Sequence, residues 1–472
     1  MQSHDDRNIS RNSKEMTIIV SFCDLVVCDQ LRTLDLTEVP KILRFHIYDK
    51  LRIFRGLRSL VLGSGTGGWS NMYIEKFSAG VMNMKNLVRF SLCYDCTDHI
   101  IKLLTRNCKH SLRIVDVEMS MQVTDASAEC LSSCKHIHTL HIFHTGITMV
   151  GHGVILTKLK DLKLLVRGGF LCEALEYIEE NMKHLPTLEL EEFWSSEEYF
   201  FHDDRQMALV ARMCPKMRKM MFQFSTEVMT DLLFLTKFSQ LSELHLWGGE
   251  FYLDRINLVI TMVGIQLSVL FLIHTEELDE NGIILISRHC PHLVTLGFYN
   301  CEFKERMIDV TDEDLLYFPR REKEEMEPML ELKSLAIVSE CEAKIALLII
   351  SAALNLEHFK TGIHCQLTDE NILKIFEKNK LQHLKSLNIP MSKYLSLATI
   401  ELLLDHCAQL QSIQDLNYWE SVSRQELKAF RKEIKEDNFD IDVGIDPVER
   451  EDQKHLDDLN DDIINFLRGN LE

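Results

Sequence analysis

The 472-residue chain lacks a long apolar run, and no stretch approaches the roughly 20 residues that a membrane-spanning helix needs. It also lacks an excess of positive charge, because 52 Lys and Arg stand against 72 Asp and Glu, for a formal net charge of −20. This balance argues against non-specific binding to nucleic acid or to an anionic membrane. We therefore expect neither nucleic acid nor a membrane as a partner.

The sequence also lacks the common fingerprints of catalysis. It contains no Gly-x-Ser-x-Gly elbow, no His-Glu-x-x-His helix and no dinucleotide-binding glycine motif. The glycine-rich run at 63–68 is not followed by the Lys of a phosphate loop, so we interpret it as a loop. Cys93 and Cys96 have the C-x-x-C spacing of a redox or zinc site, but no second such pair completes it. We expect no enzymatic activity, no cofactor and no metal.

What the chain does contain is a Leu-x-x-Leu-x-Leu motif that returns about every 26 residues. The first, fourth and sixth residues should point into a core, and a helix should follow each strand. This period predicts an α/β fold, a curved leucine-rich-repeat solenoid of about fifteen repeats with strands on the concave face and helices on the convex face. Clear copies begin at Leu31, Leu57, Ile137, Leu159, Leu185, Leu241, Leu293, Leu332 and Leu384, and looser copies at Leu87, Leu112, Met217, Leu267, Leu356 and Leu410.

The cysteines follow the repeat rather than the dense spacing of a secreted disulfide scaffold. Five of the 14 precede a repeat start by three or four residues, where a free cysteine acts as a small buried apolar residue: Cys108, Cys134, Cys214, Cys290 and Cys407. The apolar segment 16–27 is interrupted by Asp24 and lacks a small-x-small cleavage site, so we do not interpret it as a signal peptide. We expect a cytoplasmic or nuclear protein, or one found in both.

Two sequence features resemble a known repeat type. The run from Cys290 to Cys301 resembles the cysteine-containing leucine-rich repeat, and Val-Thr-Asp at 123–125 and 310–312, with Leu-Thr-Asp at 367–369, resembles its helix entry. Over about residues 31–416 the chain is thus similar to ribonuclease-inhibitor-like solenoids, which are typical of F-box/leucine-rich-repeat proteins. That resemblance implies the substrate-recognition subunit of a cullin-RING (SCF-type) ubiquitin ligase, which acts in ubiquitin-dependent protein degradation.

The ends of the chain bear on this interpretation. Residues 1–30 form an N-terminal cap or adaptor segment, 31–420 the solenoid, and 421–472 an acidic helical cap or tail. No F-box is recognisable before Leu31, and residues 36–51 instead suggest a short elongin-type box. An F-box-type or elongin-type cullin adaptor would bind this N-terminal segment.

Ser423 and Glu426 form a capping box that opens a helix. The apolar stripe in 456–467 is either part of the cap and tail or a partner-binding helix.

Two other functions stay open: a non-catalytic scaffold or inhibitor with no ligase link, and a GTPase-activating regulator of the Ran type. We expect a monomer with a protein partner on the concave face.

Side chains at concave positions are the candidate binding residues. Aromatic residues and Arg are enriched at the energetic centres of protein interfaces. The hypothesis is that these side chains bind an acidic or mixed protein segment, and the alternative is that they pack on one another along the ladder. The basic group is Arg58, Arg89, Arg113, His141, Lys160 and Lys163, and the group of aromatic residues with one histidine is Phe143, His245, Trp247, Phe271 and Tyr299.

Overall fold

The computed structural model describes residues 30–443 with gaps at 38, 40–43, 45–46, 49, 63–70, 167–169, 195–203, 224–231, 305–324, 341, 363–365, 391, 415, 417–418 and 437–440. Most of the predicted N-terminal segment, the loop at 63–68, the helix entry at 310–312 and the apolar stripe in 456–467 lie outside the described residues. Within the described part, no helix combines the length and apolarity needed to cross a membrane. The chain divides into two compact units, unit 1 (Met1–Met221 with Val228–Gln240) and unit 2 (Phe222–Glu227 with Leu241–Glu472).

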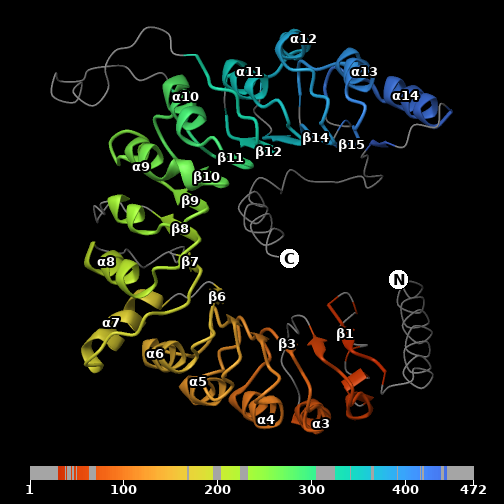
Figure 1. The fold of residues 1–472 in the computed structure, drawn as a ribbon. Helices are drawn as coiled ribbons and strands as arrows, with labels where there is room; N and C mark the ends of the chain where they lie inside the picture. Colours follow the sequence, from red (N-terminus) through yellow and green to blue (C-terminus); the bar gives the residue numbers. More distant parts are fainter. Residues whose placement is uncertain are drawn as a thin grey trace, which may run out of the picture. The chain divides into compact units, whose positions relative to one another are not determined.

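Unit 1 alternates short strands with helices (Figure 1). Strands β1 to β6 form one parallel sheet in sequence order, and β7 pairs with β8 in parallel. The strands are β1 (Thr33–Asp35), β2 (Ser59–Val61), β3 (Arg89–Ser91), β4 (Ile114–Asp116), β5 (Thr139–His141), β6 (Leu164–Val166), β7 (Glu192–Trp194) and β8 (Lys219–Gln223). The helices are η1 (Leu51–Ile53), α3 (Asn71–Val81), α4 (Asp98–Cys108), α5 (Asp125–Leu131), α6 (Met149–Lys158), α7 (Leu171–Asn181), α8 (Asp204–Met213) and η2 (Leu232–Lys237).

Unit 2 repeats the same plan, and its strands β9 to β16 are also parallel neighbours in sequence order. In each unit the helices lie on one side of the strands, and we call the other side of the sheet the open face (Figure 1). The strands are β9 (Glu243–Trp247), β10 (Val269–Ile273), β11 (Thr295–Tyr299), β12 (Ser334–Val338), β13 (His358–Thr361), β14 (Ser386–Asn388), β15 (Ser412–Gln414) and β16 (Asp442–Val443). The helices are α9 (Ile256–Val263), η3 (Gly264–Gln266), α10 (Glu280–His289), α11 (Ala343–Ala352), α12 (Asp369–Lys378), α13 (Leu397–His406) and α14 (Arg424–Glu436).

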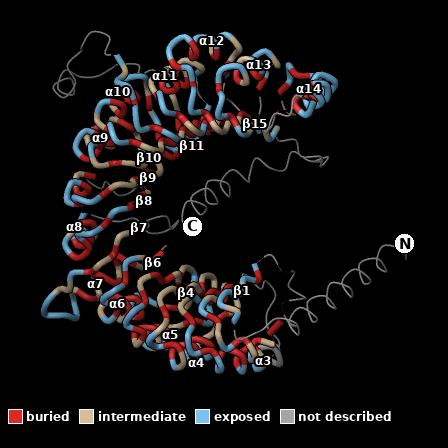
Figure 2. Tube along the Cα trace, turned by 45° about the vertical axis from the view of Figure 1, so that its right-hand side comes forward, coloured by how far each residue is buried: buried red, intermediate tan, exposed pale blue. Residues whose placement is uncertain are grey.

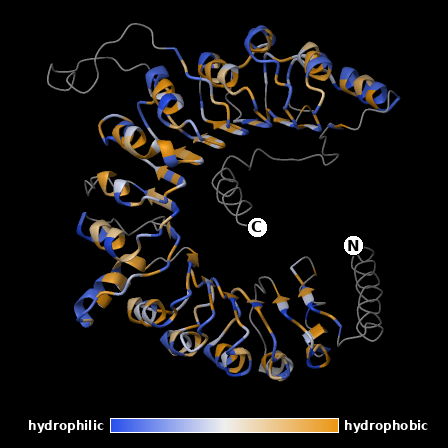
Figure 3. Ribbon diagram, in the orientation of Figure 1, coloured by the Kyte–Doolittle hydropathy of each residue, from blue (hydrophilic) through white to orange (hydrophobic). Residues whose placement is uncertain are grey.

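The core follows the repeat motif. Counting the first leucine as position 1, positions 1, 4 and 6 are buried in β2 (Leu57, Leu60, Leu62), and the same positions are buried in β3 to β5 and β9 to β12. Figure 2 shows buried residues recurring at each strand, and Figure 3 shows the apolar residues behind this pattern. A lone strand and helix cannot bury these residues, so each repeat depends on its neighbours. The predicted α/β leucine-rich-repeat fold is confirmed, and β1 to β15 supply one strand each to fifteen repeats of the described part.

The predicted strand register is wrong for two repeats. Leu140 of β5 pairs with Leu165, so Leu162 and not Leu159 takes position 1 in β6. Phe193 pairs with Met220, so the next strand is centred on Phe193 and not on Leu188. In both places leucines at the same spacing precede the true motif, and only pairing with the neighbouring strand selects between the two registers.

The Thr-Asp pairs at the helix entries connect each repeat to the next. Asp98, at the start of α4, accepts hydrogen bonds from the Thr124 backbone N–H (2.8 Å) and hydroxyl (2.6 Å), while Thr124 itself caps α5. Asp369 in unit 2 accepts the same pair of bonds from Ser396, at 3.0 and 2.7 Å. The hydroxyls of Ser127 and Thr399 also donate to Asp98 and Asp369, respectively. Partial burial acts to raise the pKa of both carboxyl groups, but all these hydrogen bonds together hold each pKa below its usual value.

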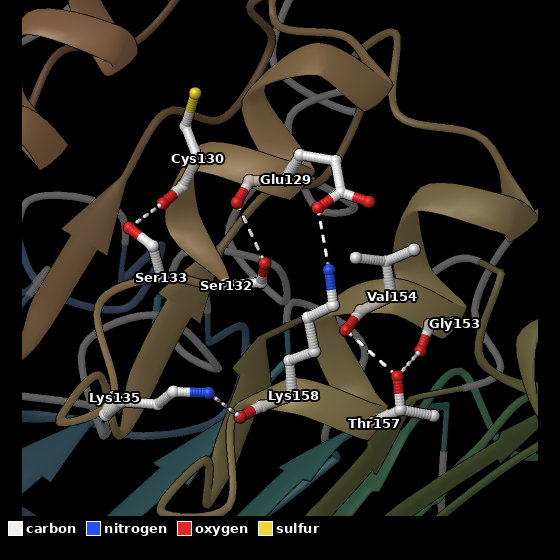
Figure 4. A network of polar contacts seen from close by, with 9 residues as sticks. All are labelled: Glu129, Cys130, Ser132, Ser133, Lys135, Gly153, Val154, Thr157 and Lys158. Carbon is white, nitrogen blue, oxygen red and sulfur yellow. Dashed lines mark hydrogen bonds and ion pairs between the residues drawn. The ribbon is translucent and has the colours of Figure 1, made fainter.

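Other polar contacts join the helices. Lys158 pairs with Glu129 at 2.7 Å, and Lys135 donates to the backbone carbonyl of Lys158 at 3.4 Å (Figure 4). These contacts link α6 to α5 and to the turn that follows α5. Exposed pairs of this kind contribute little stability, so the apolar core carries most of the packing energy.

Two further predictions about local structure are confirmed. The cysteines predicted at the repeat boundaries are all buried and free: Cys108, Cys134, Cys214, Cys290 and Cys407. In the predicted capping box, the Glu426 N–H donates to Ser423 Oγ (3.2 Å) and the Ser423 N–H donates to the Glu426 carboxylate (2.8 Å). This box opens α14, whose buried face carries three apolar side chains: Leu427, Phe430 and Ile434.

Candidate protein-binding surface

Three arginines lie at the starts of three consecutive strands of unit 1. Arg89 begins β3, and Arg58 and Arg113 immediately precede β2 and β4. The Arg89 N–H donates to the Arg58 carbonyl at 3.0 Å, and Arg89 pairs with Ser59 of β2 and Ile114 of β4, so it lies one residue further along its strand than Arg58 and Arg113 do. The neighbouring strands lie about 4.8 Å apart. Arg58 and Arg89 are exposed, and Arg113 is half-buried. We call these three residues the arginine ladder.

The arginine ladder has no counter-ion among the described residues. No carboxylate there pairs with Arg58 or Arg89, and the Arg113 guanidinium donates only to the backbone carbonyls of His110 (3.2 Å) and Leu112 (3.0 Å). Like charges at this spacing repel, more weakly in water than in a dry interior. A bound anion would remove that repulsion.

Two further basic residues follow at the starts of β5 and β6. His138 N–H donates to the Arg113 carbonyl, and Lys163 N–H donates to the His138 carbonyl, both at 2.9 Å. Partial burial, followed by the charges of Arg113 and Lys163, lowers the pKa of His138. Lys163 is exposed and pairs with Glu191 at 3.0 Å. The sequence analysis missed His138, although it occupies position 2 of its repeat, as Arg58 and Arg113 do.

The other predicted residues of unit 1 differ in their surroundings. His141, at position 5 of its repeat, lies 3.6 Å from a Glu118 carboxylate oxygen, and the half-buried Phe143 ring contacts His144 at a centroid distance of 4.0 Å. Lys160 was predicted at an open-face position of a strand, and this prediction is wrong. It lies in the turn before β6, because Leu162 starts that repeat. Lys160 is therefore separate from the arginine ladder.

The aromatic residues of unit 2 pack on one another along the strands. The His245 ring lies 4.7 Å from the Phe271 ring, which lies 5.8 Å from the Tyr299 ring. Their relative exposures are 0%, 1% and 3%, although all three alternate with core positions. His245 Nε2 also contacts a Glu243 carboxylate oxygen at 2.6 Å. These contacts agree with the alternative prediction for this group, in which the side chains pack on one another along successive strands.

Gly297 makes this ring packing possible. A Cβ at this position would lie 2.3 Å from Cδ1 of Phe271, closer than side-chain carbons approach one another. The Phe271 ring therefore occupies the space next to Gly297 of β11. Trp247, at the end of β9, is half-buried and stacks on His274 with ring centroids 5.8 Å apart. Of the predicted aromatic residues in unit 2, Trp247 keeps the most exposed surface.

The described residues offer little support for metal or thiol chemistry. They contain no group of three or more His, Cys, Asp or Glu side chains arranged to hold a metal ion. Cys93 and Cys96 are free, and burial raises the pKa of both thiols well above its usual value. A protonated thiol is a poor nucleophile and a poor metal ligand.

No protein-family model matches the chain. No curated protein matches its sequence. Solved structures similar to the chain include an internalin from Listeria monocytogenes (12% identity, 86% of this chain and 89% of that chain, TM-score 0.36) and a leucine-rich-repeat protein from Leptospira interrogans (13%, 88% and 90%, 0.31). A third is the complex of Rad7 and Elc1 in yeast (12%, 89% and 94%, 0.39). The leucine-rich-repeat architecture is established by the strands and helices of this chain itself.

Proposed function

We propose that this chain is a non-enzymatic protein-recognition solenoid that binds an acidic segment of a partner protein on the open face of unit 1. The observation that carries this proposal is the arginine ladder: three guanidinium groups on consecutive strands of a chain with net charge −20, without a carboxylate partner among the described residues. Arg is also the residue best suited to bind carboxylates in a two-pronged geometry.

The spacing of the ladder fits an extended or helical segment lying across the strands. The three arginines lie on strands about 4.8 Å apart, so their guanidinium groups would meet carboxylates on successive turns of a partner helix or on alternate residues of a partner strand. Because the ladder is exposed, its attraction for an acidic partner should weaken as salt is added. The main energetic effect is expected on the association rate and on the choice of partner.

We further propose that this recognition serves a cullin-type ubiquitin ligase. Support comes from the resemblance of Cys290–Cys301 and of the Thr-Asp helix entries to the repeats of F-box/leucine-rich-repeat proteins. The helix entries act in this structure as capping residues that link adjacent repeats. A ligase receptor must bind an adaptor as well as a target, and residues 1–30 remain the proposed docking segment.

Affinity purification of the full chain would test both parts. Its matched variants are Arg89→Glu/Arg113→Glu on the ladder and Lys102→Glu/Arg106→Glu on the exposed side of α4, which make the same change in charge on another face. The target should be lost with the first variant and retained with the second. A target that binds the ladder variant as tightly as the original chain would refute the proposed surface.

The same purification tests the ligase proposal separately. A cullin and its adaptor should be recovered with the original chain and with both variants, because adaptor docking is assigned to the N-terminal segment. Recovery of a target without any cullin or adaptor would refute the ligase role. The protein-recognition role would then stand alone.

A further inference from the structure

One repeat position has an unusual backbone conformation. Position 8, two residues after the last core residue of the motif, has positive φ in six repeats of the part of the chain that the structure describes. In unit 1 these residues are Tyr94 (φ 66°), Met119 (60°) and His144 (49°), and in unit 2 they are Gly248 (82°), His274 (52°) and Asn300 (50°). Glycine and asparagine adopt this left-handed region most readily, whereas a bulky side chain is strained there.

The three residues of unit 1 are not explained by core packing. Tyr94 is 48% exposed, His144 is exposed and Met119 is half-exposed, so their side chains contribute little to the apolar interior. Glycine would fit this backbone better at all three sites. Strain kept without a gain in packing indicates that the side chains serve another role.

These side chains form a row along one edge of the sheet. The Tyr94 N–H donates to the Glu118 carbonyl (3.0 Å) and the Met119 N–H donates to the Phe143 carbonyl (2.8 Å), so the three loops are adjacent. Met121, which is 68% exposed, lies in the middle loop and extends the row. We call this row, with its neighbouring phenylalanine, the edge ridge: Tyr94, Met119, Met121, Phe143 and His144.

The edge ridge lies on the same repeats as most of the arginine ladder. Tyr94 is the fifth residue after Arg89, which corresponds to at most about 16 Å along the chain. The start of each strand therefore presents positive charge, and the loop after its end presents large apolar and aromatic side chains. Exposed Met side chains adapt to partners of varied shape, and contiguous exposed apolar residues mark interaction sites.

We propose that the edge ridge and the arginine ladder form one surface, which binds a partner-protein segment containing both acidic and large apolar side chains. The acidic side chains contact the ladder, and the apolar ones cover the ridge. This inference rests on the proposed function and adds the second chemical requirement for the partner. His274 in unit 2, with the same backbone conformation but outside this surface, takes no part.

The test uses the full chain and a displayed library of random 16-residue peptides as the probe. Selected peptides are then measured by fluorescence anisotropy against Tyr94→Gly/Met119→Gly, Arg89→Glu and the matched control His274→Gly. We expect peptides rich in both acidic and large apolar residues, with affinity at least tenfold weaker for the first two variants and within twofold for the control. Because glycine relieves strain, the melting temperature of the ridge variant should be unchanged or higher by roughly 2 °C.

The outcomes separate the two proposals. Peptides that need Arg89 but bind the Tyr94→Gly/Met119→Gly variant normally overturn the ridge inference and leave the proposed function standing. Peptides that need neither, or failure to select any peptide, overturn both. A melting temperature several degrees lower in the ridge variant would show that Tyr94 and Met119 stabilise the fold, and would also overturn the inference.

Discussion

The two units carry the same repeat but present different open faces. In unit 1, strands β1 to β6 are three residues long, and exposed charged side chains lie at or just before their starts, including Arg58 and Arg89. In unit 2, strands β9 to β12 are five residues long, and rings at the open-face positions of β9 to β11, such as Phe271, are buried against one another. Positions 1, 4 and 6 specify the repeat, and the remaining positions decide whether a face stays free to bind a partner or packs on itself.

The largest effect is expected where the rings of unit 2 pack. Phe271→Ala removes a ring that is 1% exposed and should lower the local stability of β9 to β11 by about 3–5 kcal/mol. Gly297→Ala should cost about 1–3 kcal/mol, because the new Cβ collides with that ring. Amide hydrogen exchange of the peptides covering β9 to β11 in the full chain measures both.

The double variant sharpens this prediction. With the Phe271 ring absent, the Cβ introduced by Gly297→Ala no longer collides with it. The stability lost in the double variant should therefore be smaller than the sum of the losses in the two single variants. Additive costs would mean that Phe271 and Gly297 are independent, and the account of the buried face of unit 2 would be wrong.

An intermediate effect, equal in the two units, is expected at the helix entries. Asp98→Ala and Asp369→Ala should each cost about 1–2 kcal/mol at neutral pH, because each removes hydrogen bonds from the entry of the following helix. The pKa of each carboxyl group is lowered in the folded state, so its contribution is present above the unfolded pKa of about 3.9 and is lost as the pH falls through the folded pKa. Hydrogen exchange of the local helices, followed from about pH 7 downward to below pH 4, should show this loss.

Asp405→Ala is the control for these two variants, since Asp405 is an exposed carboxylate of α13. It should change stability by less than about 0.5 kcal/mol at any pH in that range. A large effect at one helix entry and none at the other would show that the two units are not built alike in this respect.

The smallest effect is expected at His141, which shares repeat position 5 with Phe271 but belongs to unit 1. Its contact with Glu118, at 3.6 Å, is partly exposed, so His141→Ala should cost less than about 0.5 kcal/mol. Hydrogen exchange of β4 to β6 measures this. A cost comparable to that of Phe271→Ala would remove the difference between the two open faces.

Much of the fold was predictable because it depends on local periodicity. Most Leu-x-x-Leu-x-Leu copies bury their own leucines, and β1 to β15 follow the predicted number of repeats. The register failed at Leu159 and Leu185, where a second leucine pattern overlaps the true one. Local spacing does not distinguish the two patterns, whereas pairing with β5 and with β8 does.

The candidate site was less predictable. Arg58, Arg89 and Arg113 were predicted on the open side, and the structure places them at the starts of three consecutive strands. Phe271 and Tyr299 were predicted as open-face binding residues in the same way as the arginines, yet both are buried. Their burial depends on the ring of the neighbouring repeat and on the missing side chain of Gly297.

The sequence by itself determined the repeat, the core positions and the excess of positive side chains at strand starts in unit 1, because these follow from residue spacing alone. The tertiary structure decided which open-face side chains remain exposed. It also decided that Tyr94, Met119 and His144 occupy a left-handed backbone and align along one edge. Exposure and backbone strain depend on the adjacent repeats, since each strand and loop is positioned by hydrogen bonds to its neighbours.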